Sequence, residues 1–169
     1  MKNIRSCRGF TPQISETAFI AEDAAIIGDV AIQEEASIWY NVTIRGDVMP
    51  IRIGKQTNIQ DGSTLHGTYQ EHGCTIGNRV TIGHNVILHG CEIQDGSLIG
   101  MGSIVMDGAV IGDHSLVAAG SLVTEGKKFP PRSMIMGRPA AVKRQLTDDE
   151  VKALEESADN YLMYVSWYK

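Results

Sequence analysis

An aliphatic residue recurs every six positions along most of this chain of 169 residues. The first run consists of Ile20, Ile26, Ile32, Ile38 and Ile44, and four positions after each stands a small apolar residue: Ala24, Val30, Ala36, Val42 and Val48. A six-residue period fits neither the alternation of a lone strand nor the period of a helix. It is typical of a parallel β-helix, in which each hexapeptide forms a short strand and a turn, and three hexapeptides complete one triangular coil.

The period is interrupted twice before it ends. We expect a loop at Met49-Pro50, because proline cannot donate a hydrogen bond to a strand ladder. We expect a second, protruding loop at residues 67–74, which are polar and contain glycine. The apolar positions then continue as Ile53, Ile59, Leu65, Ile76, Ile82, Leu88, Ile93, Ile99, Val105, Ile111, Val117 and Val123. The pattern therefore predicts a coil over residues 11–126.

The remainder of the chain changes character. Residues 127–146 carry three of the five prolines up to Pro139 and are expected to be a connector out of the coil. A helix is predicted over residues 147–168, where Thr147 and Glu150 fit a capping box. Its apolar residues recur at helical spacing: Val151, Leu154, Ala158, Tyr161, Leu162 and Val165. We predict a single domain, 1–169, an all-β solenoid with the C-terminal helix packed on one outer face.

Composition excludes several classes of function. The net charge of −5 gives no electrostatic reason to bind nucleic acid or an anionic membrane. No apolar run approaches the ~20 residues of a membrane span, and Met1–Phe10 lacks the apolar core of a secretory signal. The three cysteines are irregularly spaced, which argues against a disulfide framework and favours a cytoplasmic location: Cys7, Cys74 and Cys91.

Stacking of the coils places three histidines where a metal ion could bind. Counting three hexapeptides per coil, Leu65 and Leu88 occupy equivalent positions one strand spacing apart, about 4.8 Å. The residues that follow them, His66 and His89, should therefore point outward side by side. His84 belongs to the preceding face, so that it could reach the same ion only from a neighbouring subunit. The geometry predicts a homotrimer with one metal site at each interface.

The same count brings further polar side chains toward this interface: Arg45, Asp47, Gln60 and Asp61. Arg45 lies one coil before His66 on the same face. Asp61 stands in the same relation to His84. The two remaining histidines are interpreted as solvated turn residues: His72 and His114.

This set of residues resembles the motifs of γ-class carbonic anhydrases and their carbonic-anhydrase-like relatives. The residues concerned are Arg45-Gly46-Asp47, Gln60-Asp61, His66, His84 and His89. The resemblance covers nearly the whole chain. It implies a left-handed β-helix and a homotrimer that holds zinc, or another divalent metal such as iron or cobalt, at each interface.

The resemblance also implies a role for each residue. Two histidines would come from one subunit, His66 and His89, and the third from its neighbour, His84. Arg45 would form an interfacial ion pair and Gln60 would orient metal-bound solvent. Asp47 and Asp61 would be supporting acids, and Asn160 and Tyr161 fall where the family's final helix contributes to the pocket. Tyr161 also fits a plain packing role, together with its aromatic neighbours Tyr164, Trp167 and Tyr168.

Three neutral imidazoles leave one position of tetrahedral zinc open to water. Zinc lowers the pKa of that water from about 15.7 to about 7, which gives a metal-bound hydroxide at neutral pH. The expected function is therefore the reversible hydration of CO₂ to bicarbonate, with no nucleic acid or membrane as partner.

Two alternatives stay open. The well-characterised enzymes carry a glutamate where this chain has Val48, and a longer acidic loop with a proton-shuttling glutamate, whereas Glu71 is the only acid of the loop here. Hexapeptide-repeat trimers also include acyltransferases, which need a histidine base but no metal, and a CoA-thioester hydrolase using the metal is an intermediate case. The other alternative is a metal-binding trimeric scaffold with weak or no catalytic activity.

Overall fold

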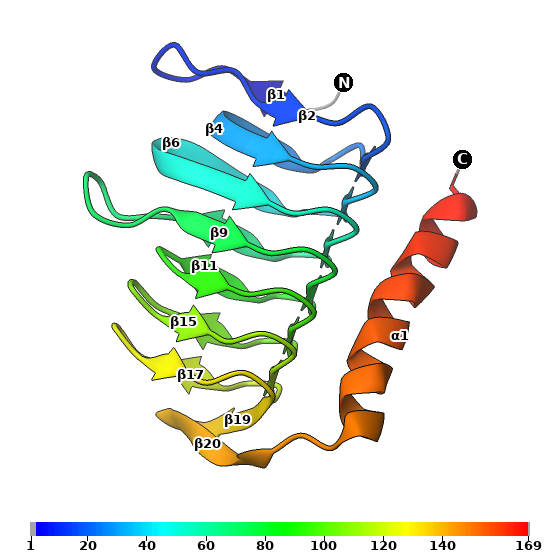
Figure 1. Cartoon of the computed structure of the whole chain (residues 1–169). Helices are drawn as coiled ribbons and strands as arrows, with labels where there is room; N and C mark the ends of the chain where they lie inside the picture. Colours follow the sequence, from blue (N-terminus) through cyan, green and yellow to red (C-terminus); the bar gives the residue numbers. More distant parts are fainter. Residues whose placement is uncertain (1–2, 169) are drawn as a thin grey trace.

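The computed structural model describes residues 3–168, which form a left-handed parallel β-helix with one α-helix along its side (Figure 1). The short strands stack coil on coil into one twelve-stranded and one eight-stranded sheet. The twelve-stranded sheet bends to form two faces of a triangular prism, and the eight-stranded sheet forms the third. The six-residue period predicted this architecture, and the prediction is confirmed.

The strands alternate among the three faces in chain order. The long strands β4 (Ala25–Ile32) and β6 (Thr43–Ile53) run around the corner between the first and second faces. The first face also contains β1 (Asn3–Arg5), β8 (Thr64–His66), β11 (Ile87–His89), β14 (Ile104–Val105) and β17 (Leu122–Val123). The second also contains β2 (Gln13–Ile14), β9 (Cys74–Ile76), β12 (Glu92–Ile93), β15 (Val110–Ile111) and β18 (Lys128–Phe129). The third contains β3 (Phe19–Ile20), β5 (Ser37–Ile38), β7 (Asn58–Ile59), β10 (Thr81–Ile82), β13 (Leu98–Ile99), β16 (Leu116–Val117), β19 (Ser133–Gly137) and β20 (Ala140–Gln145).

The first expected loop is absent. Strand β6 runs through Met49-Pro50, so the prediction of a loop there was wrong. The extra residues form a bulge in the strand instead, because β4 and β6 pair at Gly28–Gly46 on one side of it and at Val30–Ile51 on the other. Proline is tolerated at a bulge, where the hydrogen-bond ladder is already interrupted.

The second expected loop is present at residues 67–73, at the corner between the first and second faces. Backbone hydrogen bonds close it, including one from Thr68 N to His72 O of 2.9 Å. Cys74, which we assigned to this loop, is instead the first residue of β9 and is buried in the core.

The coil is longer than predicted at both ends. Residues 127–146 are not a connector, because β18 and β19 pair in parallel with β15 and β16 and so continue the prism. Strand β20 then folds back antiparallel to β19 and lies at the end of the third face. At the other end, β1 pairs with β4 before residue 11. Pro130 and Pro131 occupy the corner between β18 and β19, where a fixed φ is compatible with a turn.

The core is a column of aliphatic side chains inside the prism. The largest fully buried side chains are Ile26, Ile38, Ile44, Ile51, Ile53, Ile59, Leu65, Ile76, Ile82, Leu88, Ile93 and Ile99. Buried serines at the small positions bond to backbone carbonyls, as Ser63 Oγ does to Gly83 O at 2.9 Å. Within residues 3–168, no buried side-chain nitrogen or oxygen lacks a hydrogen-bond partner. Because every second residue of a strand points inward, its neighbours are left on the outer faces.

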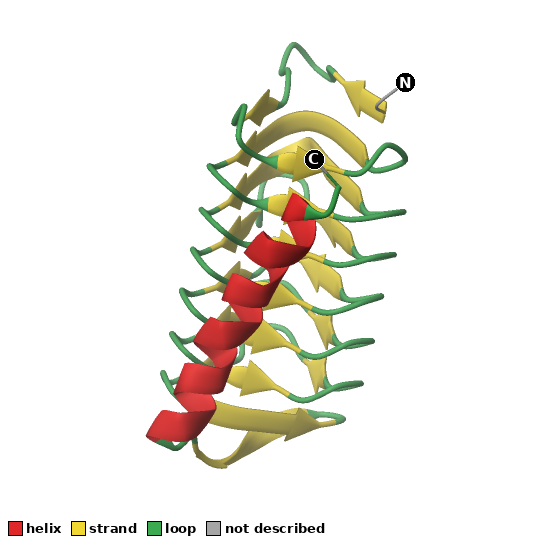
Figure 2. Ribbon diagram, turned by 90° about the vertical axis from the view of Figure 1, so that its right-hand side faces the viewer, coloured by secondary structure: helices red, strands yellow, loops and turns green. Residues whose placement is uncertain are grey.

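The helix α1 (Asp148–Ser166) packs along the third face, where it contacts β5 and β10 (Figure 2). Thr147 is the N-cap, and the capping box with Glu150 is present as predicted. The helix buries Leu154, Ala158 and Val165. Across the part of the chain that the structure describes, no helix has the length and apolar character needed to span a membrane.

Candidate metal centre

Strands β8 and β11 place two histidines next to each other. Leu65 pairs with Leu88 and His66 with His89, as the count of hexapeptides predicted. Both leucines are fully buried, so the two imidazoles lie on the outer side of the first face. His66 Nδ1 and His89 Nε2 are 3.3 Å apart.

A carboxylate holds the far nitrogen of each of these rings. His66 Nε2 lies 3.0 Å from Asp47 Oδ1, and the other oxygen of Asp47 accepts a 2.7 Å hydrogen bond from Arg45 Nη1. His89 Nδ1 lies 2.8 Å from Asp107 Oδ2. A carboxylate on one ring nitrogen fixes the orientation of the imidazole and leaves the other nitrogen for a metal. Here the two remaining nitrogens face each other.

Gly46 allows this arrangement in the Arg-Gly-Asp turn. A Cβ built on Gly46 would overlap the backbone carbonyl of Asp29 on β4, so that only glycine lets β6 pass this close. The close pairing sets where β6 begins its bulge, and therefore where Asp47 stands relative to His66.

Asp107 did not appear among the predicted site residues. The signal was present, because Leu88 pairs with Val105 and Asp107 follows two residues later at the next corner. Burial alone would raise the pKa of Asp107, but hydrogen bonds from Thr68 and His89 outweigh it and hold that pKa below its ordinary value. Asp107 is therefore ionised at neutral pH and acts as an acceptor toward His89.

The protonation state of His66 also suits a ligand. Burial lowers the pKa of His66, the charge of Arg45 lowers it further, and the contact with Asp47 opposes both only in part. The net pKa lies below the ordinary value of 6.5, so the ring is neutral at neutral pH. A metal-binding imidazole must be in this neutral form.

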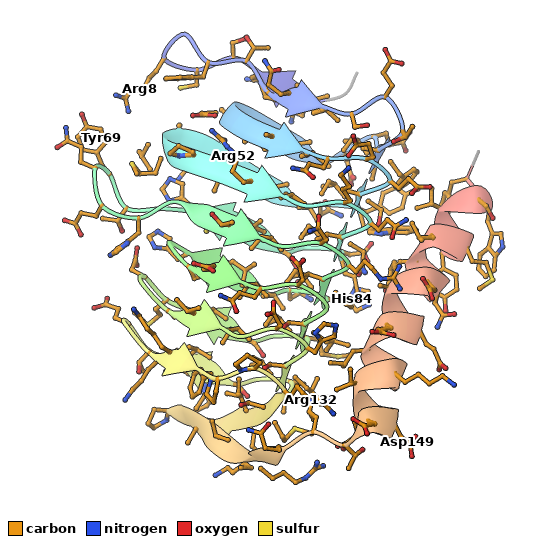
Figure 3. All side chains as sticks on the ribbon, viewed as in Figure 1. Arg8, Arg52, Tyr69, His84, Arg132 and Asp149 are labelled. Atoms are coloured by element: carbon orange, nitrogen blue, oxygen red, sulfur yellow. The ribbon has the colours of Figure 1, made fainter. Side chains whose placement is uncertain are left out.

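The third histidine lies at a different corner. His84 sits between the third and first faces, on the side of the coil that faces α1, whereas Tyr69 of loop 67–73 lies at the opposite edge (Figure 3). His84 Nδ1 is 2.9 Å from Asp61 Oδ2. The register of β7 and β10 puts Asp61 one coil before His84, as predicted. His84 is thus also held by a carboxylate through one nitrogen.

Gln60 and Tyr161 lie on the His84 side. Gln60 is buried on the third face, and its Nε2 donates to Asn58 Oδ1 at 3.1 Å. A pocket of about 240 Å³ lies between α1 and this corner, and its lining consists of Trp39, Tyr40, Asp61, Tyr161, Tyr164, Trp167 and Tyr168. Burial raises the pKa of Tyr161 to about 12, so its hydroxyl keeps its proton at neutral pH. Asn160, by contrast, is exposed and does not line the pocket.

The aromatic residues of α1 and of the turn that follows it, which contains Trp167 and Tyr168, also pack against one another and against the coil. Tyr161 meets the ring of Trp39 edge-on, with centroids 5.6 Å apart, and Tyr168 does the same at 5.4 Å. These residues therefore serve packing and line the pocket at the same time.

The remaining two histidines, and the cysteines of the core, have other surroundings. His72 is exposed on loop 67–73, and His114 is a turn residue with a φ of 51°, 3.6 Å from Glu155 of α1. Cys74 and Cys91 are buried in the core, and Cys74 Sγ lies 2.9 Å from His66 O, to which it donates.

A single chain does not bring all the predicted residues together. One group comprises Arg45, Asp47, His66 and His89, and the other comprises Gln60, Asp61, His84 and Tyr161. Over residues 3–168, no cluster of three or more His, Cys, Asp or Glu side chains is placed to hold a metal ion. A site made of three histidines would require a second subunit.

The donor set of the first group fits a divalent metal ion. Two nitrogens bound to one tetrahedral zinc at about 2.0–2.1 Å stand about 3.3–3.4 Å apart. The separation of His66 Nδ1 and His89 Nε2 is 3.3 Å. The pair could therefore share a cation without a change in the backbone.

Comparison with known proteins first defines the class. Residues 90–125 match the family model described as bacterial transferase hexapeptide (six repeats). Together with the left-handed coil, this match makes the chain a hexapeptide-repeat β-helix protein.

Comparison with individual proteins then defines the family. The chain is 48% identical over 162 residues to a protein of Geobacillus kaustophilus named carbonic anhydrase, with 96% of this chain and 88% of that protein covered. It is 43% identical over 155 residues to Gamma carbonic anhydrase 1, mitochondrial, of Arabidopsis thaliana, and this match covers 89% of the chain and 56% of that protein. The chain therefore belongs to the γ-class carbonic anhydrase family, as its motifs indicated.

The fold agrees with solved structures. A protein from Anaplasma phagocytophilum described as a hexapeptide transferase family protein superposes with a TM-score of 0.94 at 44% identity, over 99% of each chain.

Proposed function

We propose that this protein is a metal-dependent carbonic anhydrase that hydrates CO₂ reversibly at the interfaces of a homotrimer. One observation carries the proposal: His66 Nδ1 and His89 Nε2 face each other 3.3 Å apart, while carboxylates hold the other nitrogen of each ring. The names of the relatives support the reaction. His84 is held by Asp61 at another corner of the chain, so a site with three histidines takes its third ligand from a second subunit.

In this proposal, His66 and His89 of one subunit and His84 of the next hold zinc, or iron or cobalt. The bound metal supplies the Lewis acidity that makes water a nucleophile at neutral pH. Asp47, Asp107 and Asp61 each fix one of the three rings. The side chain of Arg45 is 43% exposed although it pairs with Asp47, so it remains able to form an ion pair across the interface.

The second group of residues would shape the substrate side of the same site. The aromatic lining of the pocket beside His84 suits a neutral, apolar molecule such as CO₂. The Asp61 carboxylate in that lining disfavours an anion, which would help bicarbonate to leave. Gln60 lies next to Asp61 in the chain and would orient the attacking water, and Tyr161 would donate its retained proton in a hydrogen bond.

Anaerobic purification followed by elemental analysis and stopped-flow CO₂ hydration on the same sample tests this proposal. We expect about one metal ion per chain, as a three-histidine site at each interface requires. His66→Ala, His84→Ala and His89→Ala should each abolish hydration, whereas the control His114→Ala should retain it. Full occupancy by zinc, iron or cobalt with no detectable hydration would refute the assignment of the reaction. We further propose a cytoplasmic location, which the three free thiols support.

Acyl transfer is a second candidate, favoured by the description of the matching repeat family and of the Anaplasma structure. A metal-free acyltransferase needs neither the His66–His89 pair nor its carboxylates. Calorimetry with acetyl-CoA and longer acyl-CoA esters separates the two functions, because only a transferase or a CoA-thioester hydrolase should bind them. A trimer that keeps its metal but shows neither activity would be a scaffold.

A further inference from the structure

We propose that Asp107 is a positioning residue for His89, and that Thr68 makes loop 67–73 part of the metal centre by holding Asp107 in place. The inference rests on the proposed metal site and adds to it a residue from the next coil and a loop.

The first support is a continuous line of contacts. Thr68 Oγ1 donates to Asp107 Oδ1 at 2.8 Å, and Asp107 Oδ2 lies 2.8 Å from His89 Nδ1. The His89 ring contacts the His66 ring, and His66 contacts Asp47. Asp47 in turn accepts a hydrogen bond from Arg45. Both oxygens of Asp107 are thus engaged, one by the loop and one by the ring, and its side chain is only 19% exposed.

The second support is that the two histidines are held in the same way, each by a carboxylate whose other oxygen is fixed by a further side chain. Asp47 holds His66 on one side, and its second oxygen is fixed by Arg45. Asp107 holds His89 on the other side, and its second oxygen is fixed by Thr68. If the first arrangement orients a metal-binding ring, the second does so by the same physical means.

The third support is the space that the chain leaves for this carboxylate. Gly90 directly follows His89 and has a φ of 60°, and a Cβ built on it would overlap Asp107 Oδ1. A side chain at this position would displace the carboxylate from His89. Gly90 is therefore needed for the contact as well as for its backbone conformation.

The loop that supplies Thr68 is itself held at several points. Glu71 N and His72 N both donate to Thr68 O at 3.1 Å, which closes a tight turn around Thr68. The Arg8 guanidinium lies over the Tyr69 ring, 5.3 Å from its centroid, and both side chains project at the same edge of the molecule (Figure 3). Arg8 Nη1 also donates to Asp47 O at 3.1 Å, so the loop and Asp47 share a neighbour.

The test is titration of the metal-free protein with Co²⁺, followed by visible absorption, which reports affinity and coordination geometry together. Asp107→Ala should weaken binding by about 10–100-fold and change the absorption bands, as loss of such a partner does elsewhere. Asp107→Asn, which keeps an acceptor of the same shape, should recover part of the loss. Thr68→Val should weaken binding by about 2–10-fold, the effect of one hydrogen bond.

Asp95→Asn is the matched control. The Asp95 carboxylate accepts hydrogen bonds from Asn78 at a corner turn, from Asn78 N at 2.8 Å and Asn78 Nδ2 at 3.1 Å. Its contact with a histidine is through the backbone, where Asp95 O accepts from His114 N, and the substitution leaves that bond in place. Its variant should bind Co²⁺ like the wild type. Circular dichroism of each metal-free variant shows that the coil is intact.

The outcomes separate this inference from the proposed function. If the wild type binds Co²⁺ and folded Asp107→Ala binds it equally well with the same spectrum, the role of Asp107 is refuted and the metal site stands. If Asp107→Ala binds weakly but the metal-loaded wild type does not hydrate CO₂, the inference holds and the proposed reaction fails. If the wild type binds no Co²⁺, both are overturned.

Discussion

The proposed metal site can be tested by recombining inactive subunits. His66 and His89 lie together on one face, whereas His84 lies at another corner beside Asp61. If each site takes the pair from one subunit and His84 from the next, then a trimer that mixes His84→Ala and His89→Ala chains contains an intact site. That site lies where a His84→Ala chain, with its complete pair, meets a His89→Ala chain that still has His84.

The expected yield follows from the cyclic arrangement. Any mixed trimer restores one of its three interfaces, and equal amounts of the two chains give mixed trimers in about three quarters of cases. The refolded or co-expressed mixture should therefore regain about one quarter of the wild-type metal content and hydration rate. Each variant alone should show neither.

A matched mixture controls for nonspecific recovery. His66→Ala and His89→Ala both remove a member of the same pair, so every interface of their mixed trimers lacks one ligand, and no activity should return. Metal analysis and stopped-flow hydration measure both mixtures. Failure of the first mixture despite demonstrated subunit exchange, or equal recovery in the second, would refute the assignment of ligands to subunits.

Two further predictions concern stability. Leu88→Ala should cost about 2–5 kcal/mol in the free energy of unfolding, because Leu88 is 0% exposed, whereas Val142→Ala on the terminal strand β20 should change it by less than about 0.5 kcal/mol because Val142 is 40% exposed. Urea unfolding followed by circular dichroism measures both, and equal losses would contradict the inward orientation of Leu88. Hydrogen bonds from Arg144 and from the backbone of Thr147 lower the pKa of Glu150 from 4.5 to about 2, so its ionised form stabilises the fold above pH 4.5 and this contribution is lost as the pH falls toward about 2. Glu150→Gln should therefore lower the unfolding temperature at neutral pH but not near pH 2, and a difference that does not change with pH would argue against the helix-capping role.

Much of the fold could be predicted because the repeat is local. The aliphatic position of each hexapeptide shows which residue points inward. Counting three hexapeptides from Leu65 to Leu88 predicted that His66 pairs with His89. The helix was predictable for the same reason, since its capping box depends on Thr147 and Glu150, three residues apart. The predictions failed where the preference of single residues, such as proline for loops, was outweighed by the pairing of the strand that contains them. Pro50 stays in β6 because a bulge already interrupts the ladder there. Residues 128–137 continue the coil because β18 and β19 pair with strands of the preceding coil.

The sequence by itself determined the order of the coils, the direction of each side chain and the neighbours of the candidate ligands along a face, because all of these follow from a constant period. Only the tertiary structure decided which polar atoms meet at the corners. Asp107 bonds to His89 from 18 residues away, and Thr68 reaches Asp107 from 39 residues away. The period places Asp107 in the coil that follows His89. Whether its carboxylate reaches the ring, and whether Thr68 reaches that carboxylate, depends on how the corner and the inserted loop bend, which the period does not specify. For the same reason the period could place His84 on a different face from its partners, but only the folded chain shows that Asp61 orients it.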